Sequence, residues 1–385
     1  MKVGILTYFG DMNSGTNLQA LAVSRIAQAA HPSAEVRIID YHPHERRWKP
    51  YLSGFSAKSL WLDIFRLRRY SRYVRSLPLT DRRLVSGDPV EATRFIDSFG
   101  FDVIYVGSDT LLELHRHKED SLTAFWLSPA IRARKVFLAP SSREVEFEKL
   151  SPRRREEMAR CLEAVDSISA RDAATRRLMA HFVPESRISM LPDPTFALDI
   201  DQEPVERYVR SRGLDRLSKP MVCMHMHRRD AHCDAIAEDL RRQGYLVASL
   251  RPAPYADILL NDVGPREVLG IFKRFEFVVT HRFHDSIFCF KNGTPVLAYP
   301  PPDYKLNSAG ESKFRSLFEM FGLEKTNLVS DFSEFSAERI LGMKDGAIDS
   351  FRAAASNIQA RLAANRDLLL SYAKDAGGSE PGEAK

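Results

Sequence analysis

The fold is indicated by the stretch Phe277-Val-Val-Thr-His-Arg-Phe-His-Asp-Ser-Ile287, which continues through Phe288-Cys-Phe-Lys-Asn-Gly293 to Thr294-Pro-Val-Leu-Ala-Tyr299. Its first part, the β-rich run 275–279, predicts a strand, and polar residues crowd into the turn that follows. The next segment is apolar almost all round and stops at Gly293, a residue that suits the left-handed position after a helix. This order of strand, turn, helix and strand is typical of a parallel α/β sheet.

The turn in this stretch predicts an anion site. A helix that is apolar all round is buried, so its N-terminus lies at the carboxyl edge of the sheet. Unpaired backbone N–H groups and the helix dipole favour a negative charge there. We therefore expect an anionic ligand near His281, Arg282 and His284.

Length and composition set the broad class. A chain of 385 residues with 44% apolar content is expected to form about two domains. The first residues enter a strand directly, without the layout of a signal peptide, and no apolar run reaches the ~18–20 residues of a membrane helix. The four cysteines are scattered along the chain. We expect reduced thiols, no structural disulfide and a cytoplasmic protein.

The chain opens with a βαβ unit. An apolar strand over 2–7, a helix over 17–30 and a strand over 36–39 follow from the hydrophobic spacing. The loop between the first strand and the helix has two glycines but lacks G-x-G-x-x-G, so a dinucleotide fingerprint is absent. Asn13 and Asn17 are the polar candidates for ligand binding in this loop, and turn or cap residues are the alternative for both.

Residues 42–100 interrupt the α/β pattern with a basic, aromatic insertion. One interpretation is a patch for an anionic or lipid-linked acceptor at a membrane surface, with residues 45–84 as the contact. The other, which we favour, is a helix that covers the first domain with Trp61, Ile64 and Phe65 inward and its arginines solvated. No helix-turn-helix, zinc-finger or RNP pattern accompanies the insertion, so we expect no nucleic-acid partner.

Later strands end in polar residues. The strand from Phe101 ends in Gly-Ser-Asp, the strand from Lys135 ends in small polar groups, and a short strand at 167–169 precedes an arginine. The carboxyl ends of parallel strands line the ligand crevice of an open sheet. The residues expected at that edge are Ser108, Asp109, Ser141, Ser142 and Arg171.

The polar segment 199–219 predicts a domain boundary. We expect an N-terminal α/β domain over 1–200, a C-terminal α/β domain over 201–350, a helix over 351–374 and a disordered tail over 375–385. The loop after Tyr299 carries Lys305, which is placed to close over a ligand.

Histidines cluster near the start of the second domain. His225 and His227 lie two apart on a strand, with His232 and Cys233 close by. This spacing matches no established zinc pattern. We interpret them as strand-end histidines and expect no metal site.

The motifs together resemble the polysaccharide pyruvyl transferase family. The likeness covers most of the chain and is carried, in order, by the Asn-Ser-Gly-Thr-Asn loop ending at Asn17, Val106-Gly-Ser-Asp109, Ala139-Pro-Ser-Ser142, Ile168-Ser-Ala-Arg-Asp172, Leu191-Pro-Asp-Pro194, the stretch 278–287 and Gly293-Thr-Pro295.

The resemblance implies a fold and a reaction. The fold is two Rossmann-like domains facing across a cleft, similar to glycosyltransferase-B enzymes, with the acceptor on the N-terminal side and phosphoenolpyruvate on the C-terminal side. The reaction transfers an enolpyruvyl unit from phosphoenolpyruvate to two hydroxyls of a sugar, as in exopolysaccharide biosynthesis, and forms a pyruvate ketal and phosphate. No cofactor beyond this co-substrate is implied, and a lipid-linked saccharide would place the enzyme at the inner face of the membrane.

The residues can be assigned roles in that reaction. Arginine's planar fork suits the phosphate and carboxylate of the donor, and histidine suits proton transfer near neutral pH. Asp109 is a candidate base or acceptor ligand, beside Ser108, Asn13 and Asn17. The catalytic candidates are His284, Asp109 and His281, and the donor-binding candidates are Arg282, Arg171, His284, Ser141, Ser142 and Lys305.

Two departures from the family pattern leave questions open. Asp285 stands where many members have a small residue, and a carboxylate beside the donor phosphate is unfavourable unless it points away and caps the helix. Thr110-Leu-Leu replaces the Gln and aromatic residue common after the Gly-Ser-Asp turn, so the acceptor is undefined. The alternatives are a nucleotide-sugar glycosyltransferase of the same architecture, or an anion-binding scaffold in envelope assembly that uses the basic insertion as its contact.

Overall fold

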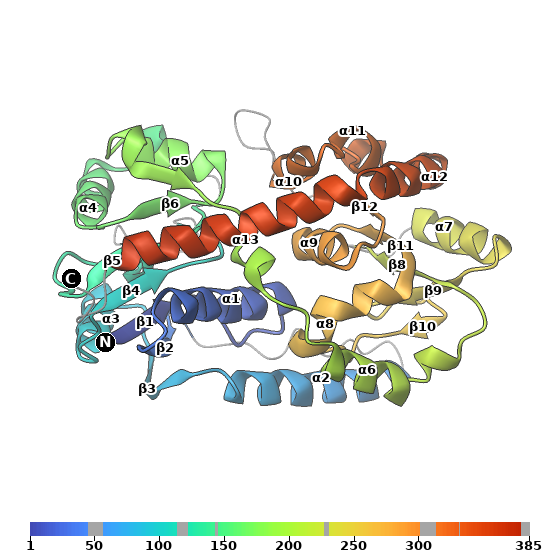
Figure 1. The fold of residues 1–385 in the computed structure, drawn as a ribbon, viewed down its shortest axis with the longest axis horizontal. Coiled ribbons are helices and arrows are strands. Elements are labelled where there is room, and N and C mark those ends of the chain that lie inside the picture. The colour runs from blue at the N-terminus through green and yellow to red at the C-terminus, as the bar shows by residue number, and fades with distance from the viewer. Residues whose placement is uncertain are drawn as a thin grey trace. The chain divides into compact units, whose positions relative to one another are not determined.

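The computed structural model describes residues 1–44, 57–113, 122–142, 145–226, 231–300, 313–330 and 332–378. The chain divides into two compact units (Figure 1). Unit 1 comprises 1–47, 74–198 and 364–385, and unit 2 comprises 48–73 and 199–363. Each unit contains one five-stranded parallel sheet.

The sheet of unit 1 has the order β3-β2-β1-β4-β5. The short β1 and β4 are apolar and almost entirely buried, as expected for central strands of a parallel sheet. A separate parallel pair, β6 and β7, lies beyond β5. The strands are β1 Lys2–Leu6, β2 Glu35–His42, β3 Leu79–Val85, β4 Val103–Val106, β5 Arg134–Phe137, β6 Ile168–Ala170 and β7 Ile188–Met190.

The helices of unit 1 begin at polar caps. Asn13, Asp88, Ser151 and Asp172 each accept a hydrogen bond from a backbone N–H of the first turn, which satisfies a donor that the helix leaves unpaired. Three of these helices contribute apolar residues, among them Ile96, Leu162 and Leu178, to a core that includes Phe125, Trp126 and Phe137. The helices are α1 Ser14–Ala30, α3 Pro89–Asp97, α4 Pro152–Glu163 and α5 Ala173–Ala180.

The sheet of unit 2 repeats the same order with different strands, β10-β9-β8-β11-β12. In both sheets the strand order reverses beside the first strand, between β1 and β4 in unit 1 and between β8 and β11 in unit 2. Ligands of open α/β sheets bind at this switch point, outside the carboxyl ends of the strands. The strands are β8 Met221–His225, β9 Leu246–Ser249, β10 Ile258–Leu259, β11 Phe275–Thr280 and β12 Val296–Ala298.

Helix α9 follows the prediction from the sequence. It spans Phe283–Asn292, buries Ile287, Phe288 and Phe290, and ends at Gly293, whose φ of 67° is left-handed. The other helices of unit 2 are α2 Ala57–Arg75, α6 Gln202–Ser211, α7 Ala231–Arg242, α8 Pro265–Ile271, α10 Lys313–Phe321, α11 Glu324–Asn327 and α12 Ala337–Ala353; α2 ends in unit 1, and α13 Ala355–Gly377 begins in unit 2 and ends in unit 1.

The segment 42–100 differs from the expected insertion. It contains α2, α3 and also β3, which pairs with β2 as the edge strand of the unit 1 sheet, while residues 48–73 belong to unit 2. The prediction that Trp61 and Phe65 face inward is wrong, because these side chains are 63% and 44% exposed. A different side of α2 is buried, and the residues on that side are Leu62, Asp63, Tyr70 and Tyr73.

Two glycines offer a matched test of packing against backbone strain. A Cβ on Gly107 would lie 1.8 Å from the carbonyl oxygen of Leu138, whereas a Cβ on Gly293 would meet nothing within 4 Å. We expect Gly293→Ala to lower the free energy of unfolding by about 1 kcal/mol, the cost of a left-handed alanine. Gly107→Ala should cost about 3 kcal/mol or more, because β4 or β5 must shift. Urea unfolding of both variants measures the difference, and equal losses would contradict the close approach.

Candidate functional site

The switch point of unit 2 gathers cationic and histidine side chains. His225, the last residue of β8, pairs in register with Thr280, the last residue of β11. His281 and Arg282 come directly after Thr280, and Arg282 occupies the N-cap position of α9. The Arg282 backbone N–H donates to Thr280 Oγ1 at 3.0 Å, while its side chain is exposed. The N-terminus of α9 and an exposed guanidinium therefore lie at one sheet edge.

Asp285 turns away from that edge and into the unit. Its Oδ2 lies 2.6 Å from His225 Nδ1 and accepts a hydrogen bond from Thr280 Oγ1 at 3.0 Å. A carboxylate acceptor assigns the proton to Nδ1, so the lone pair of the ring is on Nε2. Among the described residues, His225 Nε2 has no hydrogen-bond partner although it is buried. Asp285 thus orients a histidine, and its charge does not oppose an anion at the helix N-terminus.

His281 is held in the same tautomer by a different acceptor. Its Nδ1 lies 2.7 Å from the carbonyl oxygen of His225, so Nδ1 carries the proton and Nε2 the lone pair. Burial lowers the pKa of His281 strongly, and the neighbouring His225 and Arg282 lower it further. Burial also lowers the pKa of His225 and outweighs the opposing effect of Asp285. Both rings are therefore neutral at pH 7.

Arg251 is a member of this site that the sequence interpretation missed. It follows β9 by two residues, at the same carboxyl edge as His225 and Arg282. Burial lowers the pKa of its guanidinium, and the positive charges of Arg282 and Arg66 lower it further. Arginines close enough to repel one another are stabilised by an anion between them. Applying the strand-end rule to β9 would have found Arg251.

His284 occupies the first turn of α9 and is half-buried. Its ring lies between two phenylalanines, with centroid distances of 5.6 Å to Phe283 and 6.2 Å to Phe288. Its position two residues after Arg282 keeps it near the helix N-terminus. The structure therefore brings together three predicted residues, His281, Arg282 and His284, and adds His225 and Arg251.

The switch point of unit 1 carries a carboxylate. Asp109 follows β4, with a φ of 99°. Its Oδ2 accepts from Thr16 Oγ1 at 2.8 Å and its Oδ1 from the Thr110 backbone N–H at 2.8 Å. The residue is half-buried. These bonds hold the carboxylate in one orientation, as a hydrogen-bond acceptor for a ligand requires.

Beneath Asp109 lies a buried polar network. Asp193 Oδ2 accepts from Gln19 Nε2 at 2.7 Å and from Arg171 Nη1 at 3.1 Å. Ser108 Oγ donates to the Ala139 carbonyl oxygen at 2.9 Å and lies 3.3 Å from the Arg171 guanidinium. The Arg171 side chain is 8% exposed, so its ion pair is buried rather than on the surface. Arg171 and Ser108 support the edge from below.

The remaining predicted residues of unit 1 hold the loops. Asn13 caps α1, and the buried Asn17 accepts from the Gly10 backbone N–H at 2.9 Å. Ser141 and Ser142 are buried, and the Ser142 backbone N–H donates to Thr175 Oγ1 at 2.8 Å. Lys305 and His227 lie outside the described residues. Within the described ranges, no group of three or more His, Cys, Asp or Glu side chains is placed to hold a metal ion.

The two neutral histidines make stability depend on pH. Below 6.5, the ordinary pKa of histidine, the unfolded chain binds protons at His225 and His281 while the folded chain does not. The free energy of unfolding is therefore unaffected above that pH and falls below it, by about 1.4 kcal/mol per pH unit for each ring that stays neutral. Urea unfolding across this range should show a shallower slope for His225→Gln combined with His281→Gln than for the wild type. Identical slopes would contradict the neutral state.

Comparisons with solved structures bear on the fold. The UDP-GlcNAc 2-epimerase of Neisseria meningitidis shares 10% identity and a TM-score of 0.58, covering 97% of this chain and 99% of its own. A UDP-glucosyltransferase of Polygonum tinctorium shares 10% identity and a TM-score of 0.54, covering 98% and 99%. These are GT-B-type proteins, so the predicted GT-B-like α/β fold is confirmed.

At the level of sequence, the search of curated proteins found no match. The family model described as "Polysaccharide pyruvyl transferase" matches residues 13–303, which is more than half of the chain. That span begins at Asn13, the N-cap of α1, runs past the end of β12, and includes Asp109, His225 and Arg282. The chain belongs to the polysaccharide pyruvyl transferase family.

Proposed function

We propose that the protein transfers an enolpyruvyl unit from phosphoenolpyruvate to two hydroxyls of a sugar in a glycan or lipid-linked saccharide. The products are a pyruvate ketal and phosphate. The observation that supports this most is the cluster of Arg251 and Arg282 beside two neutral histidines, at the switch point of unit 2 and the N-terminus of α9.

The donor has two anionic groups, a phosphate and a carboxylate. Two guanidinium groups can each hold one of them through paired hydrogen bonds. The backbone N–H groups in the first turn of α9 add donors for phosphate oxygens. We assign Arg282 and Arg251 to donor binding. The guanidinium of Arg66 acts electrostatically on Arg251 and adds to the positive charge of the site. Lys305 remains a predicted donor ligand.

The reaction includes three proton transfers. The methylene carbon of phosphoenolpyruvate gains one, and C2 becomes electrophilic. The first sugar hydroxyl bonds to C2 and loses its proton, phosphate leaves, and the second hydroxyl then bonds to C2 and loses its own. One of these two protons ends on the departing phosphate, and the other replaces the proton that the enzyme gave to the methylene carbon.

Each proton transfer needs a group of suitable pKa within reach. We assign His284 as the donor to the methylene carbon. The Nε2 atom of His225, which carries the lone pair, is the candidate base, whereas the strongly lowered pKa of His281 makes that ring a weak base. Asp109 in unit 1 is an acceptor for the sugar hydroxyls. The sheet edge that carries Asp109 is held by Ser108, Ser141, Ser142 and Arg171. The neighbouring loop is shaped by Asn13 and Asn17.

Donor binding tests the anion site. Arg282→Ala and Arg251→Ala are each expected to weaken phosphoenolpyruvate binding about 10- to 100-fold, the loss of a charge-assisted hydrogen bond pair. Isothermal titration calorimetry measures it. The matched control is Arg241→Ala, which removes a half-exposed arginine paired with Asp257 in the same unit and should leave the affinity unchanged.

Two measurements separate the rival activities. In the titration, a nucleotide-sugar glycosyltransferase of this fold would bind UDP in preference to phosphoenolpyruvate. In an assay of phosphate release, a scaffold would release no phosphate with any acceptor. Absence of phosphoenolpyruvate binding by the wild type would overturn the proposal. Unchanged affinity in both arginine variants would instead reject only the residue assignment.

Turnover tests the histidines separately from binding. His284→Ala should keep donor affinity within a few-fold and reduce kcat about 100-fold or more, because a proton donor is lost. Asp285→Asn should lower kcat without changing the donor Kd, since an amide no longer selects the Nδ1–H tautomer of His225. Its pH–rate profile should also shift on the acid limb. A kcat equal to the wild type in either variant would remove that residue from the mechanism.

A further inference from the structure

The solvent face of α2 presents two aromatic and two cationic side chains in one stripe. Trp61, Phe65, Arg68 and Arg72 are spaced by four, three and four residues, which places them on the same side of a helix. Trp61 is 63% exposed, Phe65 is 44% exposed, and both arginines are exposed. Large exposed aromatic side chains four residues apart mark a surface for a partner or a membrane.

The opposite face anchors α2 to unit 2, so the stripe has a defined orientation. Leu62, Tyr70 and Tyr73 are buried. Asp63 Oδ1 accepts from Asn261 Nδ2 at 2.8 Å, and Arg69 pairs with Glu267 at 2.8 Å. The helix therefore shows Trp61 and Phe65 to solvent because its other side is already packed.

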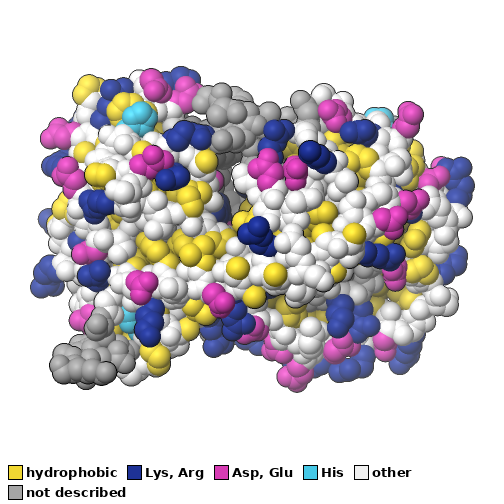
Figure 2. Space-filling view, turned by 45° about the horizontal axis from the view of Figure 1, so that its top comes forward, with side chains coloured by type: hydrophobic (Ala, Val, Ile, Leu, Met, Phe, Trp, Pro, Cys, Tyr) yellow, Lys and Arg dark blue, Asp and Glu magenta, His cyan; other side chains and the backbone are white. Residues whose placement is uncertain are grey.

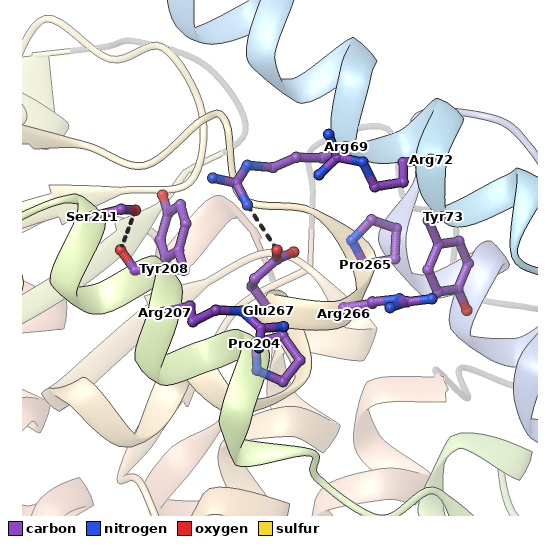
Figure 3. A pocket seen from close by; sticks show the side chains of 10 residues that line it. All are labelled: Arg69, Arg72, Tyr73, Pro204, Arg207, Tyr208, Ser211, Pro265, Arg266 and Glu267. Atoms are coloured by element: carbon purple, nitrogen blue, oxygen red, sulfur yellow. Dashed lines mark hydrogen bonds and ion pairs between the residues drawn. The ribbon is translucent and has the colours of Figure 1, made fainter.

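A cationic pocket of about 310 Å³ continues the stripe (Figure 3). Helix α2 contributes Arg69, Arg72 and Tyr73 to it, and α6 and α8 contribute Arg207 and Arg266. The acidic residue in the lining is Glu267, whose carboxylate faces Arg69. Arg69 pairs with Glu267 and Arg207 pairs with Glu203, so the four lining arginines keep an excess of positive charge over these two carboxylates, which favours a phosphate-bearing ligand.

The exposed charges of α2 are positive. Its described side chains include Arg66, Arg68, Arg69, Arg72 and Arg75, and its only acidic residue, Asp63, is buried. On the face drawn in Figure 2, by contrast, basic and acidic side chains are interspersed. The net charge of +5 is therefore concentrated in part on this helix.

We propose that α2 and the adjoining arginine pocket form a docking surface for anionic phospholipid membranes. Trp61 and Phe65 insert at the boundary between headgroups and acyl chains, where aromatic residues partition favourably. Arg68, Arg72 and the pocket arginines bind the lipid phosphates. A soluble phosphate would satisfy the arginines but not the aromatic pair, whereas a bilayer satisfies both.

The attachment is peripheral. Across the described ranges, no helix is long and apolar enough to cross a membrane. Insertion of two side chains plus several phosphate contacts gives reversible binding that weakens with salt. The surface does not depend on pyruvyl transfer, although it suits an acceptor carried on a lipid.

Vesicle flotation of the full chain tests the proposal. The wild type should float with vesicles of phosphatidylcholine and phosphatidylglycerol and not with phosphatidylcholine alone. Trp61→Ala with Phe65→Ala, and separately Arg68→Glu with Arg72→Glu, should each lower the partition coefficient at least about tenfold. The matched controls are Val90→Ala with Leu368→Ala, and Arg132→Glu with Arg153→Glu, which change exposed residues elsewhere and should bind like the wild type.

Intrinsic fluorescence gives an independent readout. The chain has three tryptophans, of which Trp61 is exposed, Trp126 is buried and Trp48 lies outside the described residues. In a Trp48→Phe background, vesicle binding should therefore shift the emission to the blue, and adding Trp61→Phe should abolish the shift. The proposal is overturned by absence of flotation with anionic vesicles, by equal losses in the control variants, or by full binding without the aromatic pair. Phosphoenolpyruvate affinity in the α2 variants should equal the wild type, which separates failure of this surface from failure of the proposed reaction.

Discussion

The short hydrogen bond between His225 Nδ1 and Asp285 is the interaction on which the site of unit 2 depends. It joins the end of β8 to the first turn of α9, and Thr280 at the end of β11 completes the connection. Removing one partner of a buried hydrogen bond of this kind costs about 1–3 kcal/mol, because the other partner is left unsatisfied. The same bond sets the tautomer of His225 and so determines where its lone pair points.

The two units use one topology for different chemistry. In unit 1 the switch point is supported by a buried pair, Arg171 and Asp193, and presents the carboxylate of Asp109. In unit 2 the switch point is supported by a buried carboxylate, Asp285, and presents arginines. An edge that offers acceptors suits hydroxyl groups, and an edge that offers cations suits an anionic donor. This contrast agrees with the assignment of acceptor and donor sides that the family resemblance implies.

Much of the candidate site could be predicted because strand ends are readable in a sequence. The apolar run before Thr280 and the glycine after α9 bracket His281, Arg282 and His284, and the same logic applies to Asp109 after β4. Arg251 was missed because it belongs to none of the motifs that carry the family resemblance, although it lies at the carboxyl end of β9. The phase of α2 was also mistaken, since a helix rich in both arginine and aromatic residues offers two apolar stripes, and only the contacts of Asp63 and Tyr70 select one.

The sequence by itself determined the α/β class, the strand-turn-helix at Arg282 and the family, because these rest on local periodicity and on motifs in a fixed order. Only the tertiary structure decided the role of Asp285. That residue is sixty positions from His225, and the parallel pairing of β8 with β11 is what brings the two side chains together. Pairing between distant strands follows from packing over the whole sheet, which no short stretch of sequence encodes.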